Sequence, residues 1–123
     1  MKGSHRIRTG KQGEDIAVAL LKKRGYRIIE RNYRCPLGEI DIVARDGDTI
    51  VFVEVKSRKT EEFGDPQFAV GQAKQKKLSR ISVMYLEEKH LFPCNARFDV
   101  VAVKMLPEGN TVELIQNAFE LVS

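Results

Sequence analysis

The stretch that decides the fold reads Gly38-Glu39-Ile40-Asp41-Ile42-Val43-Ala44-Arg45-Asp46-Gly47-Asp48-Thr49-Ile50-Val51-Phe52-Val53-Glu54-Val55-Lys56. Two runs rich in Ile and Val flank a turn signal, and this pattern predicts a β-hairpin. Acidic residues stand inside both runs, where a buried strand is normally apolar. Because successive side chains of a strand point to opposite faces, we expect Glu39 and Asp41 on one face, opposite Ile40, Ile42 and Ala44.

The second strand of this hairpin places Glu54 and Lys56 on one face, together with Phe52, and its valines on the other. A two-residue turn at Asp46-Gly47 would pair Glu39 with Glu54 and make Asp41 the diagonal neighbour of Glu54. A four-residue loop over residues 46–49 would set Asp41 directly opposite Glu54. Both registers gather the carboxylates on one face, whereas a slip by one residue would separate them.

Carboxylates gathered in this way predict a cation site. Neighbours on one face of a sheet lie about 4.5–8 Å apart between Cβ atoms, and two carboxylates at that spacing repel unless a positive charge lies between them. A divalent cation such as Mg²⁺ prefers oxygen ligands from one or two carboxylates plus water. Lys56 adds an ammonium on the same face. A solvated sheet face with a simple Glu54–Lys56 pair remains the alternative.

The hairpin motifs also carry a resemblance, together with Phe63-Gly64-Asp65-Pro66 and Arg97-Phe98-Asp99-Val100-Val101-Ala102-Val103. They resemble the YraN family of small bacterial proteins over about residues 10–119. That family is similar to restriction-endonuclease-like nucleases, and closest to archaeal Holliday-junction resolvases. The nuclease pattern, Pro-Asp followed by Asp/Glu-x-Lys, is matched at Asp41 and at Glu54-Val55-Lys56, with Ile40 where the pattern has proline.

The resemblance implies a metal-dependent nuclease site. By analogy, Asp41 and Glu54 would hold one or two Mg²⁺ or Mn²⁺ ions, with the Val55 carbonyl as a backbone ligand, and Lys56 would be catalytic. Resolvase-like nucleases also place a metal-binding Glu in the first helix, which corresponds to Glu14. On the residues alone, Glu14 is an acid in the first turn of a helix, where it interacts favourably with the helix dipole.

The resemblance also implies the partners. DNA, duplex or branched, would be the substrate, and resolving a junction needs two nicks, which suggests a homodimer. The formal net charge of +4 and the sequence pI of about 9.2 favour an anionic partner. Phosphate contacts, which position DNA without reading its sequence, are assigned to the basic residues Arg58, Lys74, Lys76, Lys77 and Arg80. A solvated helix face is the alternative for the last four.

Composition places the chain among soluble single domains. Its 123 residues are 42% hydrophobic and 31% charged, enough for one core. No segment approaches the roughly 18 apolar residues that span a bilayer, and no apolar run follows the basic N-terminus as in a secretion signal. Cys35 and Cys94 are too few for a disulfide framework. We therefore expect a cytoplasmic protein with two free thiols and no membrane contact.

The order of elements predicts the architecture. A capping box at Thr9 and Gln12 opens a helix that ends near Arg24 before Gly25, and residues 1–8 are expected to be flexible. A second helix is expected from Asp65-Pro66 to about residue 88, with a break near residue 71. Strands are expected at residues 27–34, 38–44, 50–56, 97–103 and 111–115. This order predicts a restriction-endonuclease-like α/β sandwich, a mixed central sheet of about five strands flanked by helices, in a single domain over residues 1–123.

Three functions fit these features. The first is a metal-dependent endonuclease acting on DNA phosphodiesters. The second is a nucleic-acid-binding module with a weak or inactive nuclease site, and the third is a protein-interaction domain whose acidic hairpin is structural. Glu39 stays open as a ligand, a proton relay or an exposed acid. For Asp99, a salt bridge with Arg97 or a basic neighbour is the favoured interpretation.

Overall fold

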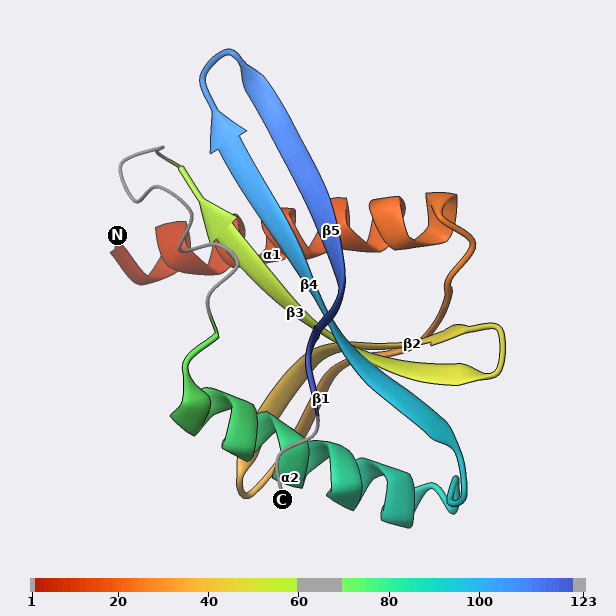
Figure 1. The fold of residues 1–123 in the computed structure, drawn as a ribbon. Helices are drawn as coiled ribbons and strands as arrows, with labels where there is room; N and C mark the ends of the chain where they lie inside the picture. The colour runs from red at the N-terminus through yellow and green to blue at the C-terminus, as the bar shows by residue number, and fades with distance from the viewer. Residues whose placement is uncertain (1, 60–69, 121–123) are drawn as a thin grey trace.

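A computed structural model describes residues 2–59 and 70–120 (Figure 1). It contains one helix, three strands, a second helix and two strands, which confirms the predicted order. The elements are α1 (Lys2–Lys23), β1 (Arg27–Cys35), β2 (Gly38–Asp46), β3 (Thr49–Arg58), α2 (Gln72–Glu88), β4 (Asn95–Leu106) and β5 (Gly109–Phe119).

The five strands form one mixed sheet in the order β1-β2-β3-β4-β5. Strands β3 and β4 are parallel, and the other neighbours are antiparallel. Parallel neighbours need a crossover connection, usually a helix, and α2 lies in the connection between β3 and β4. Helix α1 contacts mainly β3 and β4, whereas α2 contacts β2 (Figure 1). The predicted mixed sheet flanked by helices is thus confirmed.

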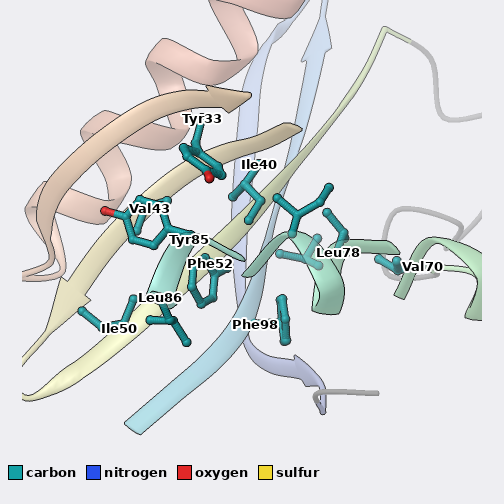
Figure 2. Packing of buried hydrophobic residues seen from close by; sticks show 12 residues of the cluster. Tyr33, Ile40, Val43, Ile50, Phe52, Val70, Leu78, Tyr85, Leu86 and Phe98 are labelled. Carbon is teal, nitrogen blue, oxygen red and sulfur yellow. The ribbon is translucent and has the colours of Figure 1, made fainter. Parts of the chain in front are cut away.

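Each helix closes its own hydrophobic core. The core on the α2 side is built around aromatic rings, with Tyr85 of α2 packed edge-on against Phe52 of β3 and Tyr33 of β1, at ring-centroid distances of 5.8 and 5.0 Å (Figure 2). The core on the α1 side consists mainly of small and branched residues, including Ala17, Leu21 and the valines of β3 and β4. Both faces of the central strands are therefore buried, which fixes their register.

Helix boundaries differ in part from those predicted. The predicted start of α1 at Thr9 is wrong: the helix begins at Lys2, so residues 2–8, expected to be flexible, continue its backbone. No proline interrupts this stretch. The C-terminal stop is as predicted, because Gly25 adopts φ +89 and its N–H bonds the Lys22 carbonyl.

Helix α2 begins at Gln72, and the two preceding residues, Val70 and Gly71, are not helical. The predicted helix start at Asp65-Pro66 lies outside the described residues. Within the described ranges, neither helix has the length and apolar character needed to cross a membrane.

A buried polar network links β4 to the segment before β1, to the β2–β3 turn and to the end of β5. Asp99 of β4 is fully buried, accepts a hydrogen bond of 2.7 Å from the Tyr26 hydroxyl and pairs with Arg97 at 3.0 Å. The Arg97 guanidinium also reaches the Asp46 carboxylate at the β2–β3 turn, at 2.8 Å. The backbone N–H of Asn117 in β5 donates to Asp99 as well. The salt bridge predicted for Asp99 is confirmed, and every buried polar side-chain atom of the described residues has a partner.

Candidate functional site

The site lies where β2 and β3 separate. Their backbone pairing runs from the tight turn, with Asp46 opposite Thr49, to Ile42 opposite Val53, and ends there. Counting one step further sets Asp41 opposite Glu54. This is the register predicted for a four-residue loop, whereas the register predicted from a two-residue turn at residues 46–47 is wrong.

On the N-terminal side of Ile42, the side chain of Asp41 accepts the hydrogen bond that a backbone carbonyl of β2 would accept in a regular pairing with β3. The backbone N–H of Val55 donates to Asp41 Oδ2 at 2.8 Å. The alternation of faces breaks at this point: Ile40 packs in the α2-side core, whereas Ile42 and Ala44 pack in the α1-side core. The prediction that Ile40 would share a face with these two residues is therefore wrong, because β2 leaves its regular pairing with β3 here. As a result, the carboxylate of Asp41 lies at the gap between the strands.

The carboxyls of Asp41 and Glu54 interact directly. Burial, a hydrogen bond with Glu54 and the negative charge of Glu54 raise the pKa of Asp41 to about 8, whereas the hydrogen bond from Val55 opposes that rise. Burial and the neighbouring Glu54 thus favour the protonated form of Asp41. Glu54 is largely buried, and its Oε2 lies 2.8 Å from the ammonium of Lys74 on α2. The α2 helix therefore supplies the positive charge that the two carboxyls need.

Lys56 lies two residues beyond Glu54 on β3, near enough for the charge of Glu54 to act on it. Burial lowers the pKa of its ammonium, the nearby Lys74 lowers it further, and the charge of Glu54 partly compensates. Lys56 and Lys74 thus bring two ammonium groups close to one carboxylate. This arrangement concentrates positive charge at the edge of the carboxyl pair.

A cleft of about 760 Å³ opens on the α1 side of Asp41, and we call it the α1-side cleft. Helix α1 contributes Glu14, which pairs with Arg31 at 2.7 Å and accepts from Asn32 at 3.1 Å. The Arg31 guanidinium also reaches Asp15 at 2.7 Å. The lining residues are Gly10, Lys11, Glu14, Arg31, Asn32, Arg34, Glu39, Asp41, Val55 and Ser57.

Helix α1 comes close to β3 at this cleft because Gly13 has no side chain. A Cβ added at Gly13 would collide with Ser57 Oγ and lie 3.0 Å from Ser57 Cβ. A larger residue would have to turn the Ser57 side chain aside or move the helix away from β3. Gly13 therefore permits the close approach of α1 next to Glu14.

A second cleft, the α2-side cleft, has a volume of about 440 Å³. Its lining residues are Glu39, Asp41, Glu54, Ala73, Lys74, Lys77, Leu78 and Ile81. Lys77 packs against Gly38, where an added Cβ would lie 2.8 Å from Lys77 Cε. Gly38 adopts φ +144, a backbone conformation that favours glycine.

The predicted basic residues divide into two groups. Lys74 and Lys77 line the α2-side cleft. Lys76 and Arg80, one helical turn apart and exposed, line neither this cleft nor the α1-side cleft. The Arg58 guanidinium bonds the carbonyl of the adjacent Ser57 at 2.9 Å. The structure therefore brings two of the five predicted cations to the site.

The donor groups fit a hard divalent cation in part. The carboxyls of Asp41 and Glu54 are close enough to share a proton, and a cation bound by both would take the place of that proton and of the Lys74 ammonium beside Glu54. Glu14 lines the same cleft as Asp41 but is held by Arg31 and Asn32. No cluster of three or more His, Cys, Asp or Glu residues with metal-binding geometry occurs within the described ranges. The core donor set is therefore the Asp41–Glu54 pair.

The sequence analysis did not assign Lys11, Arg31 and Arg34, which line the α1-side cleft. Arg31 and Arg34 flank the buried Tyr33 in a strand that is otherwise mostly exposed. The two arginines are three residues apart, so regular strand alternation would place them on opposite faces. The sequence pattern therefore carries no signal that both line one cleft.

Comparison with known proteins agrees with this framework. The model of the "Uncharacterised protein family UPF0102" matches residues 13–103, which include the whole β2–β3 hairpin and most of β4. This chain belongs to the UPF0102 family. UPF0102 is the YraN family, so the resemblance seen in the motifs is confirmed.

Close UPF0102 relatives cover nearly the whole chain. A UPF0102 protein of Syntrophus aciditrophicus is 63% identical over 115 residues, covering 94% of this chain and 91% of the relative. A UPF0102 protein of Desulfosudis oleivorans is 48% identical over 117 residues, covering 95% and 94%. One from Moorella thermoacetica is 50% identical over 116 residues, covering 93% and 97%.

Proposed function

We propose that this UPF0102 chain is a metal-dependent endonuclease that hydrolyses DNA phosphodiesters with Mg²⁺ or Mn²⁺ bound by Asp41 and Glu54. One observation carries the proposal. Two carboxyls on adjacent strands meet at the gap between β2 and β3, and Asp41 lines two clefts that both contain cationic side chains. Carboxyls set beside cationic side chains would suit a divalent cation and a phosphate diester that the cation activates.

The protein groups have distinct roles in this proposal. Asp41 would hold the cation through its carboxylate, whose orientation is set in advance by the hydrogen bond from the Val55 N–H. Glu54, now paired with Lys74, would be the second carboxylate ligand, and the Val55 carbonyl would be the backbone ligand that the resemblance implies. The bound cation supplies Lewis acidity and positive charge at the scissile phosphate.

Lys56 acts on the substrate and not on the cation. An ammonium has hydrogen-bond donors and no free lone pair, so it cannot be a metal ligand. Its place beside Glu54 suits stabilisation of the charge that develops on the phosphate oxygens, or orientation of the attacking water. Lys74 and Lys77, on the wall of the α2-side cleft, bind the phosphates next to the reacting one. These contacts orient the strand without reading its bases.

Branched DNA is the favoured substrate within this proposal, on the resemblance to junction resolvases. Paired nicks across a junction need two copies of the site, so we propose a homodimer as the active form. Sedimentation of the protein with and without a four-way junction tests this. A single copy bound to the junction at saturating protein would contradict it.

A metal titration coupled to a nicking assay tests the proposal directly. We expect calorimetry to detect Mn²⁺ binding to the wild-type protein and none to Asp41→Ala. Highly purified wild-type protein should nick a fluorescent four-way junction in Mn²⁺, and Asp41→Ala should not. Absence of nicking on linear, flapped and four-way DNA would contradict the catalytic part of the proposal.

A second candidate, a nucleic-acid-binding module with a weak or inactive site, is favoured by one observation. Lys74 occupies the carboxylate of Glu54, and Arg31 occupies that of Glu14, so protein cations already neutralise both acids. Under this alternative the protein binds DNA in the absence of divalent ions, and Mn²⁺ changes neither its affinity nor its stability. DNA binding that weakens with salt, together with no effect of Mn²⁺ on affinity or stability, would favour the binding-module alternative.

A further inference from the structure

The two clefts adjoin at one pair of residues. Glu39 and Asp41 line both the α1-side cleft and the α2-side cleft. Asp41 lies at the gap where β2 and β3 have stopped pairing, so no backbone ladder separates the clefts at this point. We call the two adjoining clefts together the groove. Its lining includes Asp41, Glu54 and residues from the N-terminal halves of α1 (Gly10, Lys11, Glu14) and α2 (Ala73, Lys74, Lys77).

Cations line this groove at both ends. The α2 end carries Lys74 and Lys77, and the α1 end carries Lys11, Arg31 and Arg34. A polyanion that reached the carboxyl pair from only one side would make no contact with the cations at the other end. The distribution of charge therefore fits a chain of phosphates that continues past the carboxyls in both directions.

The α1-end cations retain donors for such a ligand. Arg34 is 78% exposed and uses its Nε for Glu39, at 3.0 Å. The remaining N–H groups of that guanidinium point to no carboxylate of the described residues, and an arginine has five donors. No ion pair joins Lys11 to any carboxylate within residues 2–59 and 70–120. Arg31 is held in place by Glu14 and Asp15, so it is ordered in advance of binding.

We infer that one strand of duplex DNA crosses the groove from the α2-side cleft to the α1-side cleft, and that Lys11, Arg31 and Arg34 bind its phosphates beyond the reacting one. This inference rests on the proposed function for the position of the reacting phosphate. It assigns to the α1-side cleft a ligand class, the sugar-phosphate backbone, and it predicts a footprint on both sides of the cut.

Charge-matched variants test the assignment. Fluorescence anisotropy with a labelled DNA duplex in EDTA separates binding from cleavage. The variant Lys11→Gln/Arg34→Gln removes two charges from the α1-side cleft. The control Lys22→Gln/Lys23→Gln removes two charges from the exposed last turn of the same helix.

We expect the cleft pair to weaken binding about tenfold and to lower the slope of log affinity against log salt by about 1.8, the value for two lost phosphate contacts. The control pair should weaken binding less than about twofold, because it changes only the distant field. Equal losses for the two pairs would overturn the inference, since they would mean a diffuse basic surface. Tighter binding of an RNA duplex of the same length would overturn DNA as the occupant.

A gain of negative charge provides an independent arm. A Cβ added at Gly10 meets no atom within 4 Å, so Gly10→Glu places a carboxylate in the cleft without a clash. This variant should bind DNA about tenfold more weakly while unfolding no earlier than the wild type. The control Ala19→Glu makes the same charge change at another exposed position of α1 and should leave binding nearly unchanged.

The outcomes separate this inference from the function on which it rests. If the cleft variants bind DNA as tightly as the wild type while the wild-type protein nicks DNA, the proposed path of the strand is wrong and the nuclease proposal stands. If the variants behave as expected but no nicking occurs, the catalytic proposal is wrong and the path stands. If the wild-type protein does not bind DNA at low salt, both are overturned.

Discussion

The ammonium of Lys74 lies 2.8 Å from Oε2 of Glu54, so a side chain of α2 already pairs with one of the two carboxyls proposed to hold a cation. A cation bound at that carboxylate would compete with Lys74. The proposed site thus predicts that its affinity for metal depends on a residue that is not itself a ligand.

Replacing Lys74 by methionine should tighten Mn²⁺ binding by about threefold to tenfold, because removal of a neighbouring positive charge favours a bound cation. Calorimetry with Mn²⁺ measures this directly. Lys76→Met makes the same change on the same helix but lines neither cleft, so its effect should be small. Weaker Mn²⁺ binding by Lys74→Met would show that the ammonium supports the site.

Asp41→Asn should stabilise the metal-free protein at alkaline pH. A carboxyl whose pKa is raised from 3.8 to about 8 stabilises the fold at low pH, and this contribution is lost as pH rises through about 8. The amide of Asn mimics the protonated acid: its oxygen accepts from the Val55 N–H and its NH₂ donates to Glu54. At pH 8.5 in EDTA we expect a melting temperature about 3 °C or more above that of the wild type.

Thermal melts between pH 5 and 9 check this expectation, and the difference between the two proteins should shrink towards pH 5. Added Mn²⁺ should raise the melting temperature of the wild type alone. A variant that melts below the wild type at pH 8.5 would mean that Asp41 is not under electrostatic strain in the metal-free fold.

Lys56→Ala should slow single-turnover cleavage by about 100-fold or more, because a group that stabilises charge only in the transition state affects rate and not ground-state binding. Mn²⁺ affinity should stay nearly unchanged, whereas Asp41→Ala should lose metal and rate together. The assay uses a fluorescent junction with Mn²⁺, beside a metal titration. Cleavage that survives Lys56→Ala at the wild-type rate would show that the activity arises elsewhere.

Gly13→Ala should destabilise the fold by about 1–3 kcal/mol, since the added methyl collides with Ser57 Oγ and lies 3.0 Å from Ser57 Cβ, so that the Ser57 side chain must turn or the helix must shift. Gly10→Ala is the matched control, because it adds the same methyl to the same helix where no atom lies within 4 Å, and it should stabilise by about 0.5–1 kcal/mol. Urea unfolding measures both. Adding Ser57→Gly to Gly13→Ala should restore part of the loss, and strict additivity would argue against a direct collision.

Tyr26→Phe should destabilise by about 1–3 kcal/mol, because it deletes a hydroxyl that donates to the fully buried Asp99 and accepts from Arg97 and Gln116. Tyr33→Phe is the comparison: its hydroxyl donates to Glu88, which is largely exposed, so the loss should be smaller, about 0.5–1.5 kcal/mol. Urea unfolding with an Mn²⁺ titration checks both. A changed metal response in Tyr26→Phe would mean that the network also shapes the site.

Local pattern and turn signals predicted most of this fold. Ile and Val alternation, Gly25 and the Asp46-Gly47-Asp48 stretch each act within a few residues, so the order of elements and the hairpin followed from them. The α1 start was missed because a good capping box at Thr9 does not prevent a helix from beginning earlier when no proline intervenes.

The candidate site was predictable in its centre and not at its margins. Asp41, Glu54 and Lys56 are adjacent through one hairpin, so strand parity could relate them. Ile40 was placed on the wrong face because parity assumes regular pairing, and pairing between β2 and β3 ends at Ile42. Arg31 and Arg34 line the α1-side cleft only because α1 packs beside β1 and β3, and short-range sequence patterns do not predict that packing.

The hydrogen bond from the Val55 N–H to Asp41 also provides a natural spectroscopic probe. In most sheets an amide at that position would face a backbone carbonyl, whose charge does not vary. Here the acceptor is a group that gains or loses a proton and is the proposed ligand of a cation. The amide ¹H and ¹⁵N frequencies of Val55 in ¹⁵N-labelled protein should therefore shift with pH and again with a diamagnetic ion such as Mg²⁺, which allows the occupancy of the carboxyl pair to be followed in solution without an attached probe or a substrate.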